Sequence, residues 1–340
     1  MDVLQELLEE PDVTEIMVNG TEHIFVERQG RVEELEKHFD SVGQLEDLIQ
    51  QIVSRVNRTV NLASPIADAR LEDGSRVHVV LAPVALNGPI LTIRKFPEPI
   101  TMERLIESKS ISREAAAFLQ KAVEQGLNIF ISGGTGSGKT TILNAMSGYI
   151  PQEERVITIE DSAELQIRHV TNLVSLETRV ENRDGSQEIS MRDLIRASLR
   201  MRPDRIIVGE VRGGEALEML QAMNTGHDGS LSTGHANSAK DMLSRLETMV
   251  LMAAELPLAA VRSQIGSALD LMVHVGRMRD RSRKVLEITE VIGYENGEIR
   301  LSPIYQFQES GETASGQVEG ALVQVGRFEG RRRFTGGSAF

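Results

Sequence analysis

The sequence has no cysteine and no tryptophan among its 340 residues. A chain without cysteine forms no disulfide, uses no thiolate nucleophile and builds no cysteine-ligated zinc site, and it fits a reducing compartment. No apolar run reaches the roughly 18 residues that a membrane-spanning helix needs, and residues 1–6 lack the basic segment of a signal peptide. We therefore expect a cytoplasmic protein that associates with a membrane only peripherally or through a partner.

Basic residues are also in deficit. The 37 Lys and Arg face 50 Asp and Glu, which leaves a net charge of −13 and a pI near 5.2. Non-specific affinity for nucleic acid rests on an excess of Lys and Arg that neutralise phosphates. The composition therefore argues against a protein whose main affinity is for DNA or RNA, and no nucleic-acid partner is expected.

The length favours two domains, because one typical domain takes about 100–200 residues. In the first, residues 1–100, short apolar runs alternate with turn signals over 13–35 and 76–94, which predicts strands joined by hairpins. Between these runs, apolar residues recur at helical spacing behind a capping pattern made by Ser41 and Gln44. This region is therefore expected to be a small α+β domain.

Two prolines in the run 96–99 end the first domain, since proline interrupts helices and central strands, and a linker or hinge is expected over 101–112. The second domain, 113–307, alternates predicted strands and helices, which indicates a parallel sheet covered by helices. Residues 308–340 are rich in Gly, Ser and Glu and are expected to form a flexible tail. The predicted elements are strands at 128–132, 156–159 and 205–209, helices from Lys139, near 190–201, at 239–254 and at 257–270, and a hairpin turning at Asn296-Gly297.

A phosphate-binding pattern stands where a predicted buried strand meets a helix. Glycines allow backbone N–H groups to close around a β-phosphate, Lys139 reaches the β- and γ-phosphates, and the Thr140 hydroxyl can bind Mg²⁺. The context of strand, loop and helix makes this a P-loop and predicts that the protein binds ATP and Mg²⁺. The predicted nucleotide-binding residues of this loop are Gly133, Gly134, Thr135, Gly136, Ser137, Gly138, Lys139, Thr140 and Thr141.

Two apolar strands that follow the P-loop end in carboxylates. The first leads into Glu160 and Glu164, and the second leads into Glu210 and Arg212. Parallel strands release polar residues at the carboxyl edge of the sheet, where the P-loop also lies, so these groups can converge on one site. Hydrolysis needs acidic groups for Mg²⁺ and for the attacking water, and these residues are the candidates.

Two histidines, His227 and His235, lie in a segment of small residues. Neither helical i,i+4 spacing nor a third ligand accompanies them, so no zinc site is expected. Imidazoles that interact with a γ-phosphate or with switch residues suit an ATPase better. Loop histidines in ordinary hydrogen bonds are the alternative.

The order of these motifs resembles that of the secretion ATPases of type II and type IV systems, closest to the CpaF/TadA branch that powers Tad (Flp) pilus assembly. The resemblance covers roughly residues 10–305. It implies an α/β fold, in which a C-terminal RecA-like P-loop NTPase domain with a parallel sheet follows a smaller α+β N-terminal domain. It also implies a homo-hexamer that binds nucleotide between the two domains and acts on an inner-membrane platform protein.

The same resemblance implies roles for single residues. Glu164 or Glu160 would orient the attacking water, Glu210 would support Mg²⁺ and the water network, and His235 would sense the γ-phosphate. Three arginines of the N-terminal domain are candidates for stabilising charge, and Arg212 and His227 are expected near the nucleotide. The sequence departs from many type II relatives, which carry a four-cysteine zinc module, and from several relatives that have aspartate where it has Gly213. The candidate arginines are Arg94, Arg70 and Arg76.

Three functions are carried forward. The first is a hexameric ATPase that couples ATP hydrolysis to pilus assembly or protein secretion. The second is a nucleic-acid-dependent RecA-like translocase, to which a basic cluster near the predicted hairpin would contribute. The third is a nucleotide-gated scaffold that barely hydrolyses ATP. The basic cluster consists of Arg277, Arg279, Arg281, Arg283 and Lys284.

Overall fold

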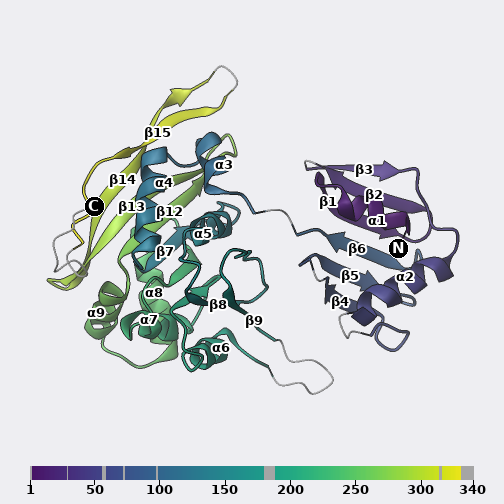
Figure 1. Ribbon diagram of the computed structural model, residues 1–340, viewed down its shortest axis with the longest axis horizontal. Coiled ribbons are helices and arrows are strands. Elements are labelled where there is room, and N and C mark those ends of the chain that lie inside the picture. The colour runs from purple at the N-terminus through teal and green to yellow at the C-terminus, as the bar shows by residue number, and fades with distance from the viewer. Residues whose placement is uncertain are drawn as a thin grey trace. The chain divides into compact units, whose positions relative to one another are not determined.

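The computed structural model describes residues 2–28, 30–55, 59–71, 73–96, 99–179, 188–313 and 316–330. The chain divides into two compact units, unit 1 at Met1–Glu98 and unit 2 at Pro99–Phe340 (Figure 1). No helix within the described ranges is both long enough and apolar enough to cross a membrane.

Unit 1 is built on a six-stranded antiparallel sheet in the order β3-β2-β1-β6-β5-β4. Its strands alternate buried and exposed residues, because one face packs on helices and the other meets solvent. The two helices α1 (Asp2–Glu9) and α2 (Val42–Arg55) bury leucine, isoleucine and valine against that inner face. The strands are β1 (Val13–Asn19), β2 (His23–Arg28), β3 (Arg31–Leu35), β4 (Ile66–Arg70), β5 (Arg76–Val80) and β6 (Ile90–Arg94).

Unit 2 contains a nine-stranded sheet in the order β15-β14-β13-β12-β7-β11-β10-β8-β9. The six strands from β12 to β9 run parallel, and the remaining three extend the sheet antiparallel. The strands are β7 (Ile129–Gly133), β8 (Arg155–Glu160), β9 (Asn172–Glu177), β10 (Arg205–Val208), β11 (Leu231–His235), β12 (Leu271–Arg277), β13 (Arg283–Glu295), β14 (Glu298–Glu312) and β15 (Val318–Gln324).

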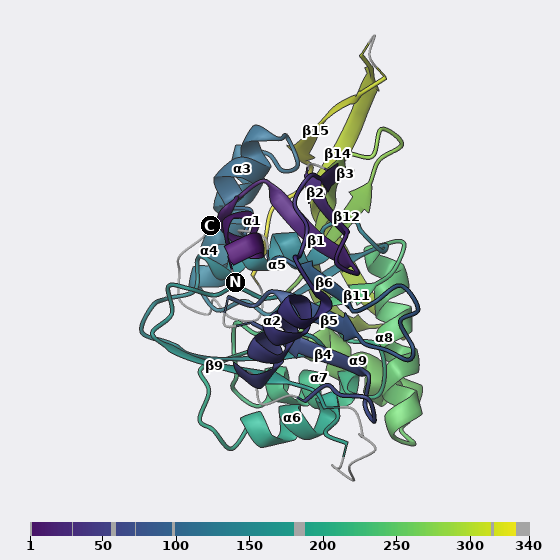
Figure 2. The same ribbon diagram turned by 90° about the vertical axis from the view of Figure 1, so that its right-hand side faces the viewer.

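Helices cover both faces of this sheet, as expected for buried parallel strands (Figure 2). Along β7, Ile129 and Ile131 join the apolar core under α3, α4 and α5, whereas Phe130 joins the core under α6 to α9. The helices are α3 (Met102–Glu107), α4 (Arg113–Glu124), α5 (Lys139–Ser147), α6 (Met191–Ser198), α7 (Ala216–Asn224), α8 (Ala239–Ala253) and α9 (Leu258–Ala268). This architecture confirms the predicted fold class.

Two expectations about segments at the borders of unit 2 differ from the structure. The expected linker at 101–112 contains α3, which Thr101 caps and which buries Met102 and Leu105 in the core of unit 2. The expected flexible tail at 308–340 instead continues β14 and forms β15, where Val318 and Leu322 are buried. Its polar composition misled the prediction, because an edge strand needs few apolar residues. Residues 331–340 lie outside the described part.

Candidate functional site

The P-loop connects the end of β7 to the start of α5. A side chain at Gly133 would begin 2.4 Å from the Val275 carbonyl oxygen and 2.5 Å from Ser137 Oγ, so only glycine fits there. Gly136 and Gly138 adopt φ of +70° and +99°, a region that glycine enters without strain. The loop thus aims the N–H groups at the start of α5 toward one point, as an anion site requires.

Lys139 is buried at the start of α5. Its Nζ donates hydrogen bonds to the Gly134 carbonyl oxygen at 3.2 Å and to His235 Nδ1 at 3.2 Å. Burial lowers the pKa of Lys139, and the nearby Glu210 carboxylate opposes that shift. The ammonium group is therefore held within the P-loop by weak partners that a phosphate oxygen can replace.

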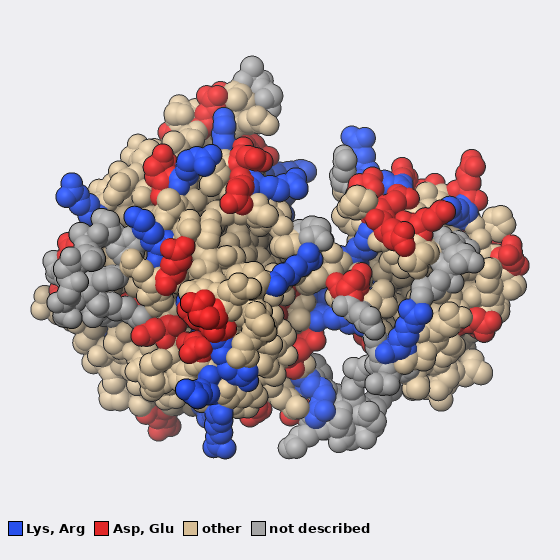
Figure 3. All heavy atoms as spheres, viewed as in Figure 1, with Lys and Arg blue, Asp and Glu red and all other residues tan. Residues whose placement is uncertain are grey.

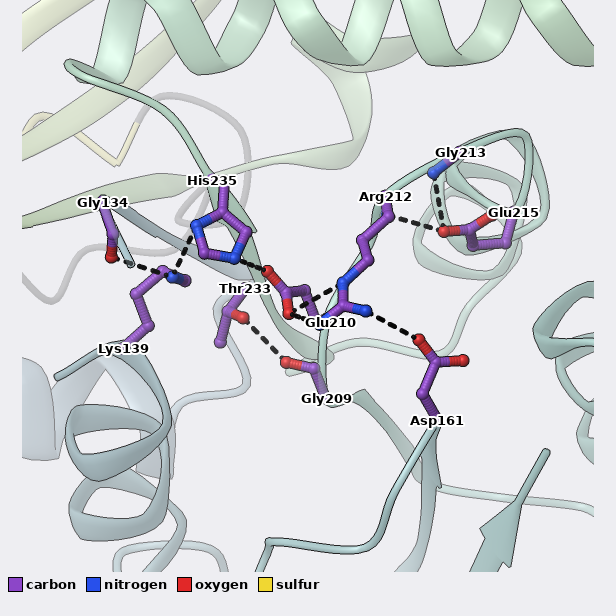
Figure 4. A network of polar contacts seen from close by, with 10 residues as sticks. All are labelled: Gly134, Lys139, Asp161, Gly209, Glu210, Arg212, Gly213, Glu215, Thr233 and His235. Atoms are coloured by element: carbon purple, nitrogen blue, oxygen red, sulfur yellow. Dashed lines mark hydrogen bonds and ion pairs between the residues drawn. The ribbon is translucent and has the colours of Figure 1, made fainter. Parts of the chain in front are cut away.

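A chain of polar contacts runs from Lys139 across the carboxyl edge of the sheet (Figure 4). His235 Nε2 lies 2.5 Å from Glu210 Oε1, and Glu210 Oε2 accepts from Arg212 Nη2 at 2.6 Å. Arg212 Nη1 in turn lies 3.5 Å from Asp161 Oδ2. These contacts link the P-loop to both acidic strands that the sequence analysis singled out.

The protonation state of His235 follows from its neighbours. Burial lowers its pKa, the positive charge of Lys139 lowers it further, and the Glu210 carboxylate opposes the shift, so the net effect favours the neutral ring. Because Nδ1 accepts from Lys139, a neutral His235 ring carries its single proton on Nε2, the atom that lies next to Glu210 Oε1. His235 therefore lies between the Lys139 ammonium group and the Glu210 carboxylate.

Glu160 ends β8, and Glu164 follows four residues later. Glu160 is buried, and its Oε1 accepts from the backbone N–H groups of Glu164 at 2.8 Å and Leu165 at 3.0 Å. A side chain at Gly209, the residue after β10, would begin 2.8 Å from Glu160 Cγ, so the backbone at Gly209 packs directly against the Glu160 side chain. Glu160 shapes the segment that carries Glu164.

Two polar residues of this edge escaped the sequence analysis. Thr233 Oγ1 donates to the Gly209 carbonyl oxygen at 2.8 Å, and Glu215 Oε1 accepts from the N–H groups of Arg212 at 2.6 Å and Gly213 at 2.8 Å. Both hold the turn after β10 that presents Glu210. The only signal in the sequence was their proximity to the recognised motifs.

The structure separates the two histidines of the predicted histidine box. His235 ends β11 beside the P-loop, whereas His227 precedes Leu231, the first residue of that strand. β11 alone spans roughly 13 Å. His227 Nδ1 donates to the Ala222 carbonyl oxygen at 3.1 Å, at the amino edge of the sheet. The structure therefore does not bring His227 to the P-loop of its own chain, because a strand carries its two ends to opposite edges, and a role for His227 at a nucleotide stays a prediction.

The three candidate arginines of unit 1 form one row. Arg70 pairs with Arg76 across β4 and β5, Arg76 pairs with Arg94 across β5 and β6, and Arg94 pairs with Glu15 of β1. Side chains directly opposite one another share a face, and like charges there destabilise a sheet by a few tenths of a kcal/mol or more. One face of the sheet in unit 1 therefore carries these three arginines side by side, with Glu15 next to Arg94. We name Arg70, Arg76 and Arg94 the arginine row.

Comparison with known proteins identifies the family. A family model described as "Type II/IV secretion system protein" matches residues 1–315. The chain belongs to this family. A putative conjugal transfer protein of Mycobacterium tuberculosis (strain ATCC 25618 / H37Rv) is 36% identical over 293 residues, covering 84% of this chain and 83% of the relative. The conjugal transfer protein TrbB of Rhizobium radiobacter is 34% identical over 317 residues, covering 92% and 94%.

A further relative agrees with this assignment, and two solved structures share the fold. The type IV secretion system protein PtlH of Bordetella pertussis is 33% identical over 315 residues, covering 85% of this chain and 93% of PtlH. The structure of the pilus retraction motor PilT with bound ADP has a TM-score of 0.59, 21% identity and coverage of 88% and 80%. The ATPase DotB of Legionella pneumophila has a TM-score of 0.58, 23% identity and coverage of 87% and 81%. The two structures share the fold, and the resemblance to the type II and type IV secretion family is confirmed.

Members of the type II/IV secretion family with a P-loop are expected to take ATP and Mg²⁺, and the residues present fit both. Ser137 Oγ is buried within the P-loop and finds no hydrogen-bond partner in the part of the chain that the structure describes. No group of three His, Cys, Asp or Glu side chains arranged for a metal occurs there either. Mg²⁺ keeps several waters and binds phosphates plus one or two protein oxygens, and Thr140 and Glu210 are the predicted protein oxygens.

Proposed function

We propose that this chain is an ATPase that hydrolyses ATP in the P-loop of unit 2 and drives pilus assembly or protein secretion as a homo-hexamer. The observation that carries the proposal is the contact chain from Lys139 through His235 to Glu210. It joins the predicted phosphate-binding lysine to the predicted γ-phosphate sensor and to the carboxylate expected at Mg²⁺. A phosphate-binding scaffold alone would not need this connection.

In this proposal Glu164 orients the attacking water. The carboxylate of Glu160 is buried and its Oε1 accepts two backbone hydrogen bonds, which suits a positioning role better than proton transfer. Glu164 lies four residues later on the segment that Glu160 shapes. A general base must reach water and the reacting phosphate, and this segment stands at the carboxyl edge of the sheet with the P-loop.

Phosphate binding would rearrange the contacts of Lys139. A γ-phosphate oxygen is a stronger partner for the ammonium group than a carbonyl or a neutral imidazole, because charge-assisted hydrogen bonds are about twice as strong as neutral ones. When Lys139 turns to phosphate, His235 Nδ1 loses its donor, and the change passes through Nε2 to Glu210. Bound Mg²⁺, held by Thr140 and Glu210, would neutralise developing phosphate charge.

The arginine row completes the proposed chemistry. Arg94, Arg76 and Arg70 lie side by side on one face of unit 1, and guanidinium groups bind phosphate oxygens bidentately. Nucleotide phosphate is an anion that these guanidinium groups would bind. Charge stabilisation by arginine is worth about 10³–10⁵ in rate in other P-loop NTPases.

We further propose that the chain belongs to the CpaF/TadA branch and works on the cytoplasmic side of the inner membrane, docked to a platform protein. The motif order supports the branch, and relatives named for conjugal transfer, type IV secretion and pilus retraction support a machine of this kind. Charges of both signs are interspersed on the displayed face of each unit (Figure 3), which suits a protein partner better than a nucleic-acid backbone.

The test is ATP hydrolysis by Lys139→Ala beside Lys240→Ala, an exposed lysine on α8 that serves as the matched control. We expect phosphate release to fall at least a hundredfold in Lys139→Ala and to stay unchanged in Lys240→Ala. Equal ATP turnover in the parent protein, Lys139→Ala and Lys240→Ala would overturn the site assignment. Native mass measurement with and without a non-hydrolysable ATP analogue tests the hexamer, and a monomer under both conditions would contradict it.

A further inference from the structure

The basic cluster 277–284 does not form one surface in the structure. Arg279 Nη2 pairs with Glu309 at 2.7 Å, and its Nε contacts Glu312. Lys284 is buried, donates to the Lys109 carbonyl oxygen at 3.1 Å and lies 5.7 Å from the centroid of the Phe307 ring. These two cations hold the hairpin between β12 and β13 in place.

That hairpin stands directly beside the P-loop. β12 runs parallel to β7, and Val275 is the register partner of Gly133, the first P-loop residue. The turn is fixed on its other side by Asp280, whose carboxylate accepts from the N–H groups of Ser282 at 2.9 Å and Val318 at 2.8 Å. The residues that start β13 therefore occupy a defined position above the loop.

Arg283 is the member of the cluster that reaches the P-loop. A Cβ at Gly138 would lie 3.5 Å from Arg283 Cδ and 3.9 Å from Arg283 Cβ, so the aliphatic stem rests on the loop. The side chain is exposed, and within the described ranges its guanidinium group forms no hydrogen bond or ion pair. The guanidinium N–H groups of Arg283 therefore lie near the start of α5, next to the predicted phosphate site.

A second arginine lies beside it. Arg277 is the direct register partner of Arg283 across the hairpin, and it too lacks a hydrogen-bond or ion-pair partner among the described residues. Opposed like charges destabilise a strand pair, and the amino end of α5 with Lys139 adds further positive charge. An anion held between these groups would relieve the repulsion.

We propose that Arg283 binds the phosphate chain of the nucleotide from outside the P-loop, and that the positive charge of Arg277 strengthens the attraction for phosphate. The inference rests on the proposed function, since it places this contact at the same nucleotide. It assigns a phosphate-binding arginine to unit 2 itself, separate from the arginine row of unit 1. A planar guanidinium can grip two phosphate oxygens, which the ammonium of Lys139 cannot.

The test compares Arg283→Ala with Arg281→Gly. Arg281 lies at the tip of the same hairpin with φ of +68°, so glycine removes the same charge there without backbone strain. Affinities for MgADP, magnesium pyrophosphate and adenosine are measured by calorimetry on the full chain, and thermal unfolding checks the fold. We expect Arg283→Ala to weaken MgADP and pyrophosphate about 10- to 100-fold and to leave adenosine unchanged. Arg281→Gly should match the parent within twofold.

Three results separate the possible failures. If the parent protein binds MgADP and Arg283→Ala binds it equally, the inference is wrong while the proposed function stands. If Arg283→Ala weakens adenosine as much as pyrophosphate, the side chain contacts the base and the phosphate assignment is wrong. If the parent itself binds no nucleotide, the proposed function fails first. Should Arg283→Ala unfold, Arg283→Gln replaces it, with the same expected loss for pyrophosphate.

Discussion

The two edges of the parallel sheet in unit 2 are built from the same residue types and do different things. At the carboxyl edge, Lys139, His235 and Glu210 make contacts that a ligand can exchange. At the amino edge, Arg205 is 1% exposed, donates to both carboxylate oxygens of Glu154 at 2.7 and 2.8 Å and donates to the Val123 carbonyl oxygen at 3.1 Å. Charged groups at the carboxyl edge are open to exchange with a ligand, whereas those at the amino edge are held within the fold.

A buried amide and carboxylate complete the amino edge. Asn128 N donates to Asp270 Oδ2 at 2.8 Å, Asn128 Nδ2 donates to the Ala268 carbonyl oxygen at 2.8 Å, and Asn128 Oδ1 accepts from Ser230 N at 3.0 Å. These bonds join the starts of β7, β11 and β12. Satisfied polar groups of this kind stabilise one arrangement, and breaking them is costly.

The largest effect is expected for Glu164→Gln at the carboxyl edge, where kcat should fall while stability is retained. Loss of the proposed base should lower kcat about 100- to 10,000-fold and leave the unfolding midpoint within 2 °C, by the usual magnitude of general-base catalysis. Glu160→Gln keeps an oxygen for the two backbone donors and should lower kcat less than tenfold. Steady-state phosphate release and thermal unfolding measure both, and a larger loss in Glu160→Gln would reverse the assignment.

Arg205→Met tests the amino edge. This substitution leaves the Glu154 carboxylate, whose side chain is 23% exposed, without its arginine partner. It should lower the free energy of unfolding by about 3 kcal/mol, because removing one partner of a buried ion pair is costly. Turnover per folded molecule should stay unchanged. Urea unfolding followed by circular dichroism measures the loss, and the double variant with Glu154→Leu should recover part of it. A drop below about 1 kcal/mol would show that the pair contributes little.

The smallest effect concerns the two histidines that β11 carries to opposite edges. His235→Gln should reduce kcat about 10- to 100-fold, because it interrupts the contact between Lys139 and Glu210. His227→Gln should leave kcat within about twofold, since that ring meets only a backbone carbonyl at the amino edge. The measurement is kcat for ATP hydrolysis by both variants at neutral pH. An equal fall in kcat for both would mean that His227 reaches a nucleotide site after all.

Much of the fold was predictable from local pattern. Ser41 Oγ accepts from Gln44 N at 3.2 Å, as the capping pattern indicated, and Asn296 and Gly297 turn the hairpin between β13 and β14 with φ of +51° and +87°. The P-loop was predictable because backbone geometry at Gly133, Gly136 and Gly138 demands glycine. Each of these signals comes from residues a few positions apart.

The errors arose where the answer depends on distant residues. The residues of α3 have the pattern of a linker, yet Met102 and Leu105 pack against a core assembled from the whole of unit 2. The segment after residue 308 was taken for a tail, yet Glu290 binds the N–H groups of Glu329 at 2.8 Å and Gly330 at 2.9 Å. Neither partner is visible in a local window of sequence.

The sequence by itself determined the P-loop, the acidic strands and the family, because these rest on residue type and short spacing. Tertiary structure decided which members of each motif work together. It placed His235 beside the P-loop and His227 at the opposite edge of the sheet, buried Glu160 with its carboxylate on the Glu164 N–H group, and set Arg283 against Gly138 from 145 residues away along the chain. Strand direction and sheet order bring distant residues together, and one-dimensional spacing carries no record of either.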